Sequence, residues 1–328
     1  MKVAILDDWL DTISKLPCFS KLKNLDVTIF TDHENDIEKL IKRLRPFDAL
    51  VLFRERTLIT SQLIEQLPNL KIISQRSVYP HIDVDACTRN NVLLCSKLNS
   101  DNPPFATAEH TWALILSSVR QIPQQMANMK AGLWQMGVGK TLHGKCLGLY
   151  GYGRIAKIVA KYADAFGVEV IWWGSKQGRS RAKADGLVVA ASRQEFFSKP
   201  DIISLHVRLK TETAGLIKFQ DLDLMRDGSL FVNTSRAGLI EEGAILKYLN
   251  SGKNKFAALD VFDSEPIKEP NDPLVSHPNI ICTPHIGFVT EEEFELQFSD
   301  IFDQILAYQT GKPINVINPS ALRDLNNG

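Results

Sequence analysis

The stretch that decides the fold is Cys146–Ala156, which reads CLGLYGYGRIA. An apolar strand runs into the pattern Gly-x-Gly-x-x-Ala, and the periodicity of Arg154–Phe166 predicts a helix directly after it. In such a turn Gly151 makes the tight bend, Gly153 lets the backbone approach a pyrophosphate, and Ala156 permits close packing of the helix on the strand. The free N–H groups at the helix N-terminus favour the phosphate. The stretch predicts a dinucleotide-binding turn rather than a purely structural one.

The residues after the next strand, Val168–Trp173, bear on the choice of dinucleotide. An acidic residue about 20 positions beyond the turn usually binds the ribose hydroxyls, but Gly174 stands there, and no acid follows before Asp185. The hydroxyl and cationic side chains in between are Ser175, Lys176, Arg179, Arg181 and Lys183. They can bind a 2′-phosphate, which an acid would repel, so the sequence favours NADP over NAD. The alternative interpretation is a solvated basic loop.

Working outward, short apolar runs alternate with amphipathic stretches along the whole chain, which predicts parallel βαβ units. The predicted strands are Val3–Leu6, Val27–Phe30, Ala49–Phe53, Lys71–Ser74, Cys146–Tyr150, Val168–Trp173, Ile202–Leu205, Ser229–Asn233, Ala257–Val261 and Ile280–Thr283. The predicted helices are Asp36–Leu44, Ser61–Leu67, Phe105–Arg120, Arg154–Phe166, Glu241–Asn250 and a last one from Glu291 to about Thr310. The prediction is an α/β protein with two successive sheets.

The composition excludes several classes of protein. Lysine plus arginine is 38 and aspartate plus glutamate is 38, so the formal net charge is zero, and we expect no nucleic-acid partner. No apolar run reaches the roughly 18 residues of a membrane span, and the N-terminus reads as a first strand rather than a secretory signal. The five cysteines form no C-x-x-C pair. We therefore expect no metal site, no membrane partner and a cytoplasmic location with reduced thiols.

Three further motifs each follow a predicted strand, where α/β sheets bind ligands. They are NTSRAG at Asn233–Gly238, LDVFDSEP at Leu259–Pro266 and TPHIG at Thr283–Gly287. Together with the phosphate turn, these motifs resemble the D-isomer-specific 2-hydroxyacid dehydrogenase family over nearly the whole chain. The resemblance implies an oxidoreductase that transfers hydride between NAD(P)H and a small 2-oxo or D-2-hydroxy acid, similar to glyoxylate or hydroxypyruvate.

The same resemblance makes Arg236, Glu265 and His285 the catalytic residues. The chemistry of such a reaction suits these residue types. An arginine offers a fixed fork of donors to the carboxylate of a 2-oxo acid. A histidine can give a proton to the developing alkoxide, and a neighbouring glutamate favours the imidazolium and fixes the ring.

Cofactor contacts are also implied along the strand ends of the nucleotide domain. Arg154 and Ile155 would face the pyrophosphate, and Asp260 would accept a hydrogen bond from the carboxamide. The residues expected near the adenosine and the nicotinamide are His206, Val207, Thr234 and Ser235. Arg208 replaces a proline that is usual in the family, which adds a cation near the adenosine end.

The predicted substrate pocket departs from the family pattern. The family commonly has a glycine-containing loop after the fourth strand of the substrate domain, and here the stretch Arg76, Ser77, Val78, Tyr79 contains no glycine. Arg54, after strand Ala49–Phe53, is a further candidate cation for the substrate. The alternative for these residues is ordinary loop surface.

The resemblance also implies a domain plan and competing functions. We expect a Rossmann-type doubly wound domain at 101–287 and a discontinuous, flavodoxin-like substrate domain at 1–100 and 288–328. The helix at Phe105–Arg120 and its neighbours resemble the dimer arm of the family, so a homodimer is expected. A dinucleotide-sensing or corepressor-like protein without significant turnover is the alternative function, and a relative specialised for formate or another small anion is the alternative enzyme.

Overall fold

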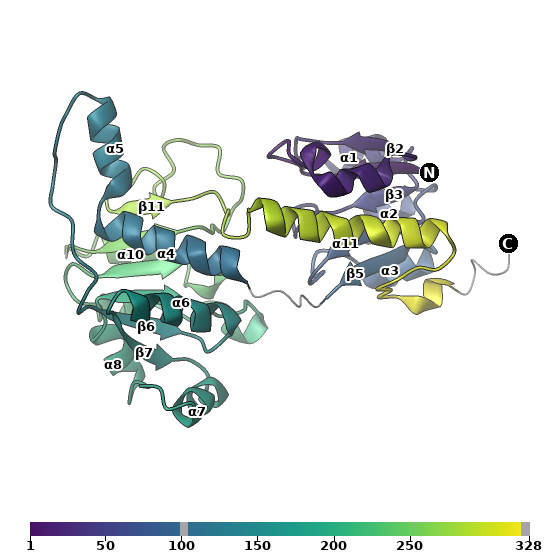
Figure 1. Ribbon diagram of the computed structural model, residues 1–328. Helices are drawn as coiled ribbons and strands as arrows, with labels where there is room; N and C mark the ends of the chain where they lie inside the picture. The colour runs from purple at the N-terminus through teal and green to yellow at the C-terminus, as the bar shows by residue number, and fades with distance from the viewer. Residues whose placement is uncertain (99–103, 253, 323–328) are drawn as a thin grey trace. The chain divides into compact units, whose positions relative to one another are not determined.

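The computed structural model describes residues 1–98, 104–252 and 254–322. The chain divides into two compact units: unit 1 comprises Met1–Asn102 and Thr290–Gly328, and unit 2 comprises Pro103–Val289. Each unit contains a parallel sheet with alternating helices (Figure 1). The predicted α/β class is therefore confirmed.

Unit 1 has a five-stranded parallel sheet in the order β2-β1-β3-β4-β5, which is the flavodoxin-like order. Its strands are β1 (Lys2–Ile5), β2 (Asp26–Ile29), β3 (Ala49–Val51), β4 (Ile72–Arg76) and β5 (Leu93–Lys97). Its helices are α1 (Ile37–Leu44), α2 (Ser61–Glu65), α3 (Val84–Arg89) and α11 (Glu291–Gln309), with 3-10 helices η1 (Ile13–Lys15), η2 (Pro17–Leu22) and η5 (Pro319–Leu322). The strand order reverses between β1 and β3, where such sheets bind ligands outside the carboxyl ends.

Helix α11 belongs to unit 1 although it follows unit 2 in the sequence. Thr290 caps it, because its side chain accepts from the Glu293 amide at 3.2 Å, and three glutamates in the first turn suit the positive end of the helix dipole. Its buried phenylalanines form a ring cluster with Phe53. Strand β4 also binds this helix, because the Ser74 hydroxyl donates to the Ile301 carbonyl at 2.8 Å. After unit 2, the chain thus returns to the sheet of unit 1, as Figure 1 shows.

Unit 2 has a six-stranded parallel sheet in the order β11-β10-β9-β8-β6-β7. A parallel bridge between Trp172 and Val189 extends it at the β7 edge, which completes the Rossmann-type doubly wound order. The strands are β6 (Cys146–Tyr150), β7 (Glu169–Trp173), β8 (Ile202–Leu205), β9 (Leu230–Asn233), β10 (Phe256–Leu259) and β11 (Ile280–Cys282). The helices are α4 (Phe105–Val119), α5 (Ile122–Lys130), α6 (Arg154–Ala165), α7 (Lys176–Ala184), α8 (Arg193–Ser198), α9 (Phe219–Asp223) and α10 (Ala244–Leu249), with 3-10 helices η3 (Thr211–Thr213) and η4 (Ala237–Leu239).

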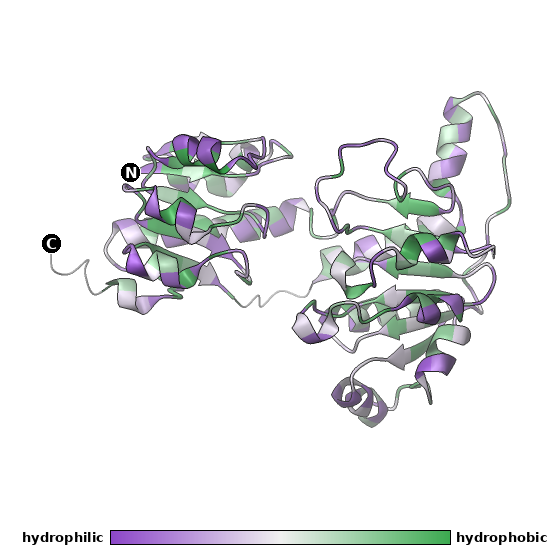
Figure 2. Cartoon of the chain, turned by 180° about the vertical axis from the view of Figure 1, so that it is seen from behind, coloured by the Kyte–Doolittle hydropathy of each residue, from purple (hydrophilic) through white to green (hydrophobic). Residues whose placement is uncertain are grey.

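The sheet of unit 2 is buried on both faces, which explains its continuous apolar strands. On one face Leu147, Leu149 and Val232 pack against α4 and α6. On the other face, residues such as Ile203 and Phe231 pack against α8, α9 and α10. Figure 2 shows the same pattern as hydrophobic strands between helices with hydrophilic outer surfaces. Fully burying each such side chain contributes about 2 kcal/mol.

One interpretation from the sequence is wrong: the basic stretch after β7 is helix α7 and not a loop. Few apolar residues mark its inner face, so its periodicity is weak. The helix forms because the Ser175 hydroxyl caps it, accepting from the Gly178 amide at 3.1 Å, and because Gly178 and Ala182 are buried. Strand β5 and helices α3, α5, α8 and α9 were likewise not predicted from the sequence. Across the described residues, no helix combines the length and apolar character needed to span a membrane.

Candidate active site

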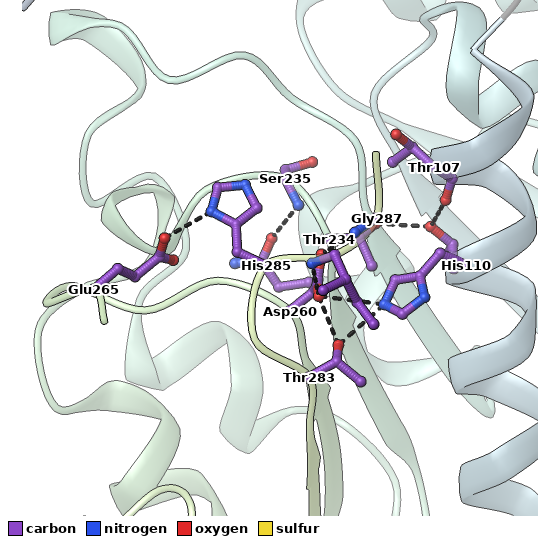
Figure 3. Close-up of polar contacts among 12 residues, drawn as sticks. Thr107, His110, Thr234, Ser235, Asp260, Glu265, Thr283, His285 and Gly287 are labelled. Atoms are coloured by element: carbon purple, nitrogen blue, oxygen red, sulfur yellow. Dashed lines mark hydrogen bonds and ion pairs between the residues drawn. The ribbon is translucent and has the colours of Figure 1, made fainter. Parts of the chain in front are cut away.

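A histidine and a glutamate pair at the carboxyl edge of the unit 2 sheet (Figure 3). Nδ1 of His285, in the loop after β11, lies 2.7 Å from Oε2 of Glu265, in the loop after β10. The two side chains are 29% and 27% exposed, so both remain accessible. The other carboxylate oxygen of Glu265 accepts from the Phe262 amide at 2.9 Å, which fixes the carboxylate. With Nδ1 committed to Glu265, Nε2 is the ring nitrogen that can exchange a proton with a substrate.

The loop after β9 carries Arg236 at the start of η4. The Asn233 side chain organises this loop, because its amide group donates to the Arg236 carbonyl at 3.0 Å and its oxygen accepts from the Ser235 amide at 2.9 Å. The Ser235 hydroxyl donates to the Leu205 carbonyl at 2.6 Å, which ties the loop to β8. The half-buried Arg236 guanidinium donates to the Ser235 carbonyl at 2.7 Å. The loop therefore has one defined backbone path.

Asp260, just after β10, is only 1% exposed and holds the loop that carries His285. Its carboxylate accepts from the Thr283 hydroxyl at 2.6 Å and from the Ile286 and Gly287 amides, each at 2.8 Å. Burial alone would raise the pKa of Asp260, but hydrogen bonds from His110, Thr283 and the Ile286 amide outweigh it and hold the pKa below its ordinary value. Asp260 is therefore a buried anion that fixes the loop.

The phosphate turn has the geometry that a pyrophosphate requires. Gly151 has φ +116°, and a Cβ there would lie 2.2 Å from the His206 carbonyl oxygen, so both backbone angle and space demand glycine. Gly153 is different, since a Cβ there would meet no atom within 4 Å. It occupies the N-cap of α6, and no side chain caps that helix. The open space and the uncapped N–H groups fit a dinucleotide phosphate, and Arg154 and Ile155 begin the same helix.

The adenosine end of the predicted cofactor site lies beyond β7 and β8. Burial lowers the pKa of His206 to about 4, so its ring is neutral near pH 7, and its Nε2 lies 2.9 Å from the Ser204 hydroxyl. The Val207 side chain lies near Gly151, since a Cβ there would be 3.3 Å from Val207 Cγ2. The Arg179 guanidinium lies 4.1 Å from the Trp173 ring centroid and donates to the Gly174 carbonyl at 2.9 Å.

Asp185, the first acid after β7, is paired with two side chains. The Tyr152 hydroxyl donates to Asp185, and the Lys157 ammonium lies 3.3 Å from the same carboxylate. These contacts hold the pKa of Asp185 below its ordinary value. The first acid after β7 is therefore already paired with donors of the phosphate turn and of α6, while Ser175 and Lys176 are exposed at the start of α7.

The predicted substrate residues of unit 1 lie in the loops that follow its strands. Asp7, Arg54 and Ser77 follow β1, β3 and β4, and all three have a positive φ, which is strained for a residue other than glycine. The Ser77 amide donates to the Lys97 carbonyl at 3.0 Å. Among the described residues, the amides of Val78 and Tyr79 have no hydrogen-bond acceptor. These two N–H groups can receive an anion.

Arg76 is held away from such a role. Its Nε lies 2.9 Å from an Asp300 carboxylate oxygen of α11, and the Arg76 side chain is only 9% exposed. Lys97 binds the other oxygen of Asp300 at 3.0 Å. The ring of Tyr79 packs against the apolar core of unit 1. The structure thus brings Ser77 and Val78 to an accessible loop and uses Arg76 and Tyr79 in packing around it.

Sequence reasoning missed a group of polar residues on α4 that contact the loops of Arg236 and His285 or the residues that hold them. His110 lies 3.2 Å from Asp260 and 3.0 Å from the Thr283 hydroxyl (Figure 3). The Thr111 hydroxyl lies 2.7 Å from that of Thr234. No spacing in the sequence signals these pairs, because their members are more than 100 positions apart. Among the described residues, no cluster of three or more histidine, cysteine or acidic side chains is placed to hold a metal ion.

Comparisons with known proteins agree on one family. The family model described as "D-isomer specific 2-hydroxyacid dehydrogenase, NAD binding domain" matches residues 112–287. The D-3-phosphoglycerate dehydrogenase of Bacillus subtilis is 36% identical over 283 residues, which is 85% of this chain and 53% of that protein. The glyoxylate reductase of Aeropyrum pernix is 32% identical over 92% of both chains. The chain thus spans about half the length of the bacterial phosphoglycerate dehydrogenase and nearly all of the glyoxylate reductase.

Two solved structures are similar over almost their full length. A putative D-3-phosphoglycerate dehydrogenase oxidoreductase from Ralstonia solanacearum has a TM-score of 0.93 at 42% identity and covers 98% of each chain. A phosphoglycerate oxidoreductase from Vibrio cholerae has a TM-score of 0.90 at 42% identity and covers 95% of this chain and 99% of its own.

Proposed function

The chain belongs to the D-isomer-specific 2-hydroxyacid dehydrogenase family, and from this premise we propose that it is an NAD(P)-dependent oxidoreductase. It would act on the CH–OH group of a small D-2-hydroxy acid or, in reverse, on the carbonyl of the 2-oxo acid. The observation that carries the proposal is the 2.7 Å pair of His285 and Glu265 at the strand ends of unit 2. Arg236 follows the neighbouring strand β9 in the same sheet.

Each of the three side chains has a distinct role in this reaction. His285 donates a proton from Nε2 to the oxygen at C2 of the 2-oxo acid, and takes it back in the oxidative direction. Glu265 holds the ring through Nδ1 and stabilises the imidazolium. Arg236 binds the substrate carboxylate and polarises the adjacent carbonyl. Bound NAD(P)H supplies the hydride.

The dinucleotide would bind along the strand ends of unit 2. Gly151 and Gly153 hold its pyrophosphate with Arg154 and Ile155, and His206 and Val207 contact the adenosine. On the nicotinamide half, the contacting residues would be Thr234, Ser235 and Asp260. One lone pair of Asp260 serves the carboxamide, because Oδ2 accepts only from the Gly287 amide among the described contacts.

We further propose that NADP is preferred over NAD. Ser175, Lys176 and Arg179 offer a hydroxyl and two cations after β7, and the nearest acid, Asp185, is paired with Tyr152 and Lys157. A 2′-phosphate would therefore meet donors without an opposing carboxylate. Replacing Lys176 by alanine should raise the KM for NADPH about tenfold and leave the KM for NADH unchanged. Lys161→Ala, at an exposed position in the second half of α6, is the matched control.

The substrate would be a small 2-oxo acid similar to glyoxylate or hydroxypyruvate. Arg54 and the loop of Ser77, Val78 and Tyr79 would contact it, with the Val78 and Tyr79 amides as donors to its carboxylate. Arg76 acts behind this loop, since its guanidinium is paired with Asp300.

A homodimer is proposed from the surface of α5 and the loop after it. No residue of α5 is buried, and Met129, Trp134 and Val138 are 65%, 74% and 89% exposed. Exposed apolar patches of this kind mark protein interfaces, and Figure 2 shows α5 standing away from the sheet of unit 2. Trp134→Glu should shift the mass measured by light scattering from dimer to monomer.

A reducing compartment, the cytoplasm, is proposed from the thiols. All five cysteines are free, and burial raises the pKa of Cys18, Cys87 and Cys95 to about 12. Such thiols stay protonated and unreactive.

The proposed activity is tested by steady-state turnover of the purified protein. NADH and NADPH should each be offered with glyoxylate, hydroxypyruvate, pyruvate, bulkier 2-oxo acids and a phosphorylated 2-oxo acid. We expect turnover of a small 2-oxo acid with NADPH as the better cofactor. A strong preference for NADH would refute the argument from α7, and cofactor binding without turnover of any acid would support a dinucleotide-sensing protein instead.

A further inference from the structure

Helix α4 presents a polar face to both catalytic loops of unit 2. Its apolar residues Ala108, Trp112 and Ile115 are buried in the core, which fixes the rotation of the helix against the sheet. Thr107, His110 and Thr111 lie on an adjoining face, since residues three and four apart in a helix are neighbours. Figure 3 shows the His110 side chain directed at Asp260 and Thr283, which follow β10 and β11.

The hydrogen bonds of His110 can be assigned from the protons available. The Thr283 hydroxyl has one proton and donates it to the Asp260 carboxylate at 2.6 Å. The Thr283 oxygen can therefore only accept from Nε2 of His110, which lies 3.0 Å away. Asp260, at 3.2 Å from the same nitrogen, is also an acceptor. His110 thus carries a proton on Nε2 and donates it to this pair.

Asp260 transmits this contact to the catalytic histidine. Its two carboxylate oxygens accept from the amides of Ile286 and Gly287, the two residues that follow His285. His285 itself has φ +53°, a strained conformation for a histidine, which persists only where surrounding contacts impose it. A Cβ at Gly287 would lie 3.0 Å from Asp260 and 3.5 Å from the His110 ring, so the loop packs closely on this cluster.

The next residue of α4 makes the corresponding contact to the arginine loop. The Thr111 hydroxyl donates to the Thr107 carbonyl at 2.7 Å. The Thr234 hydroxyl must then donate to Thr111 across their 2.7 Å contact. Thr234 is two residues before Arg236, and Thr111 is fully buried. Adjacent residues of one helix therefore hold the two loops separately.

We propose that His110 is a positioning residue for general acid–base catalysis, which acts on His285 through Thr283, Asp260 and the amides of Ile286 and Gly287. The proposal rests on the proposed function, because it assigns His110 to the proton-transfer step of that reaction. Thr111 provides the internal comparison, since it contacts the loop of Arg236 and not that of His285.

The test compares two replacements of His110 of similar size. His110→Gln keeps an N–H donor near the position of Nε2, and His110→Leu removes it. Losing a hydrogen bond to a charged group should lower kcat about 10- to 100-fold in the leucine variant, with the NADPH dissociation constant changed less than about twofold. The glutamine variant should recover most of kcat. Glu109→Gln, on the exposed neighbouring position of α4, is the matched control and should keep the wild-type kcat.

The second readout does not require turnover. The ring carbon–proton NMR signal of His285, assigned from its loss in His285→Gln, should move in His110→Leu and stay in place in Glu109→Gln. Thr111→Val should leave this signal in place and should instead raise the KM for the 2-oxo acid, since it releases the loop of Arg236.

The outcomes separate this proposal from the proposed function. A displaced His285 signal in a protein that turns over no 2-oxo acid would support the positioning role and refute the hydride-transfer function. An unchanged signal with an unchanged kcat in His110→Leu would overturn the positioning role. It is also overturned if the leucine and glutamine variants lose kcat, cofactor affinity and thermal stability together, because His110 would then serve only the packing of α4.

Discussion

The carboxyl edges of the two sheets are built from the same kind of parallel strands, but the polar side chains at the two edges have different kinds of partner. In unit 2, Glu265 faces His285, and Asp260 holds the loop that carries His285. In unit 1, Arg76 is instead committed to Asp300 of α11. The comparison teaches that the groups proposed for proton transfer are assembled within unit 2, whereas packing shapes the loops of unit 1 that are proposed to bind the substrate.

The largest effect is expected from removing His285, the proposed acid–base group of unit 2. In His285→Ala, kcat should fall about 1000-fold, because the variant lacks the imidazole proposed to exchange the proton with the substrate oxygen. The NADPH dissociation constant, measured by fluorescence titration, should change less than about twofold. A variant that keeps full kcat would refute the assignment of His285.

Two glycines of unit 2 should differ in their effects, one on stability and the other on NADPH binding. Gly151→Ala should lower the free energy of unfolding by about 3 kcal/mol, because a Cβ would meet the His206 carbonyl and φ is positive. Gly153→Ala should leave stability within about 0.5 kcal/mol but weaken NADPH binding at least about tenfold.

Urea unfolding and cofactor titration on both glycine variants separate these effects. If Gly153→Ala bound NADPH as tightly as the wild type, the open space at this position would not be the pyrophosphate site.

Two arginines at the carboxyl edge of the unit 1 sheet allow a similar test, because one is expected to affect stability and the other substrate binding. Arg76→Met should cost about 2 kcal/mol of stability, because it leaves the largely buried Asp300 with Lys97 alone. Its KM for the 2-oxo acid should stay within about threefold of the wild type. Arg54→Met should raise that KM about tenfold. Equal effects of the two variants on KM would contradict the assignment of Arg76 to packing and of Arg54 to substrate binding.

The last prediction concerns pH and one histidine in each unit, His206 and His81. Burial lowers the pKa of His206 from 6.5 to about 4, and it also lowers the pKa of His81 in unit 1. The folded protein therefore binds fewer protons at these rings than the unfolded chain, so stability should fall as the pH drops from about 6.5 towards 4. The share from His206 is at most about 3 kcal/mol.

Urea unfolding of wild type and His206→Gln at several pH values checks this dependence. The variant should lose part of the slope in that window, and an identical slope would show that His206 does not titrate as a buried ring.

Local patterns predicted the strands well where burial on both faces makes them continuously apolar. Cys146–Tyr150 and Ile202–Leu205 are strands at the predicted bounds. Helix α7 was missed because its sequence is almost wholly polar, and its stability comes from the cap at Ser175 and two small buried residues. Such a helix leaves little hydrophobic periodicity to detect.

The site shows the same limit. The candidate catalytic residues Arg236, Glu265 and His285 could be named from the sequence because their motifs resemble those of the family. The partners that fix them could not: the donor to Thr283 and Asp260 is His110, on a helix that the sequence places far from both. Likewise, nothing near Arg76 in the sequence signals its ion pair with Asp300 on α11.

The most direct measurement is the stereochemistry of oxidation by the wild-type protein. Purified enzyme with NADP⁺ should be given the D and L isomers of glycerate and lactate separately, and NADPH formation followed. We predict oxidation of a D isomer at a rate at least about 100-fold above that of its L isomer, because Arg236 and His285 fix the carboxylate and the hydroxyl on defined sides of C2. Equal oxidation of both isomers, or NADP⁺ binding with oxidation of neither, would contradict the proposed function.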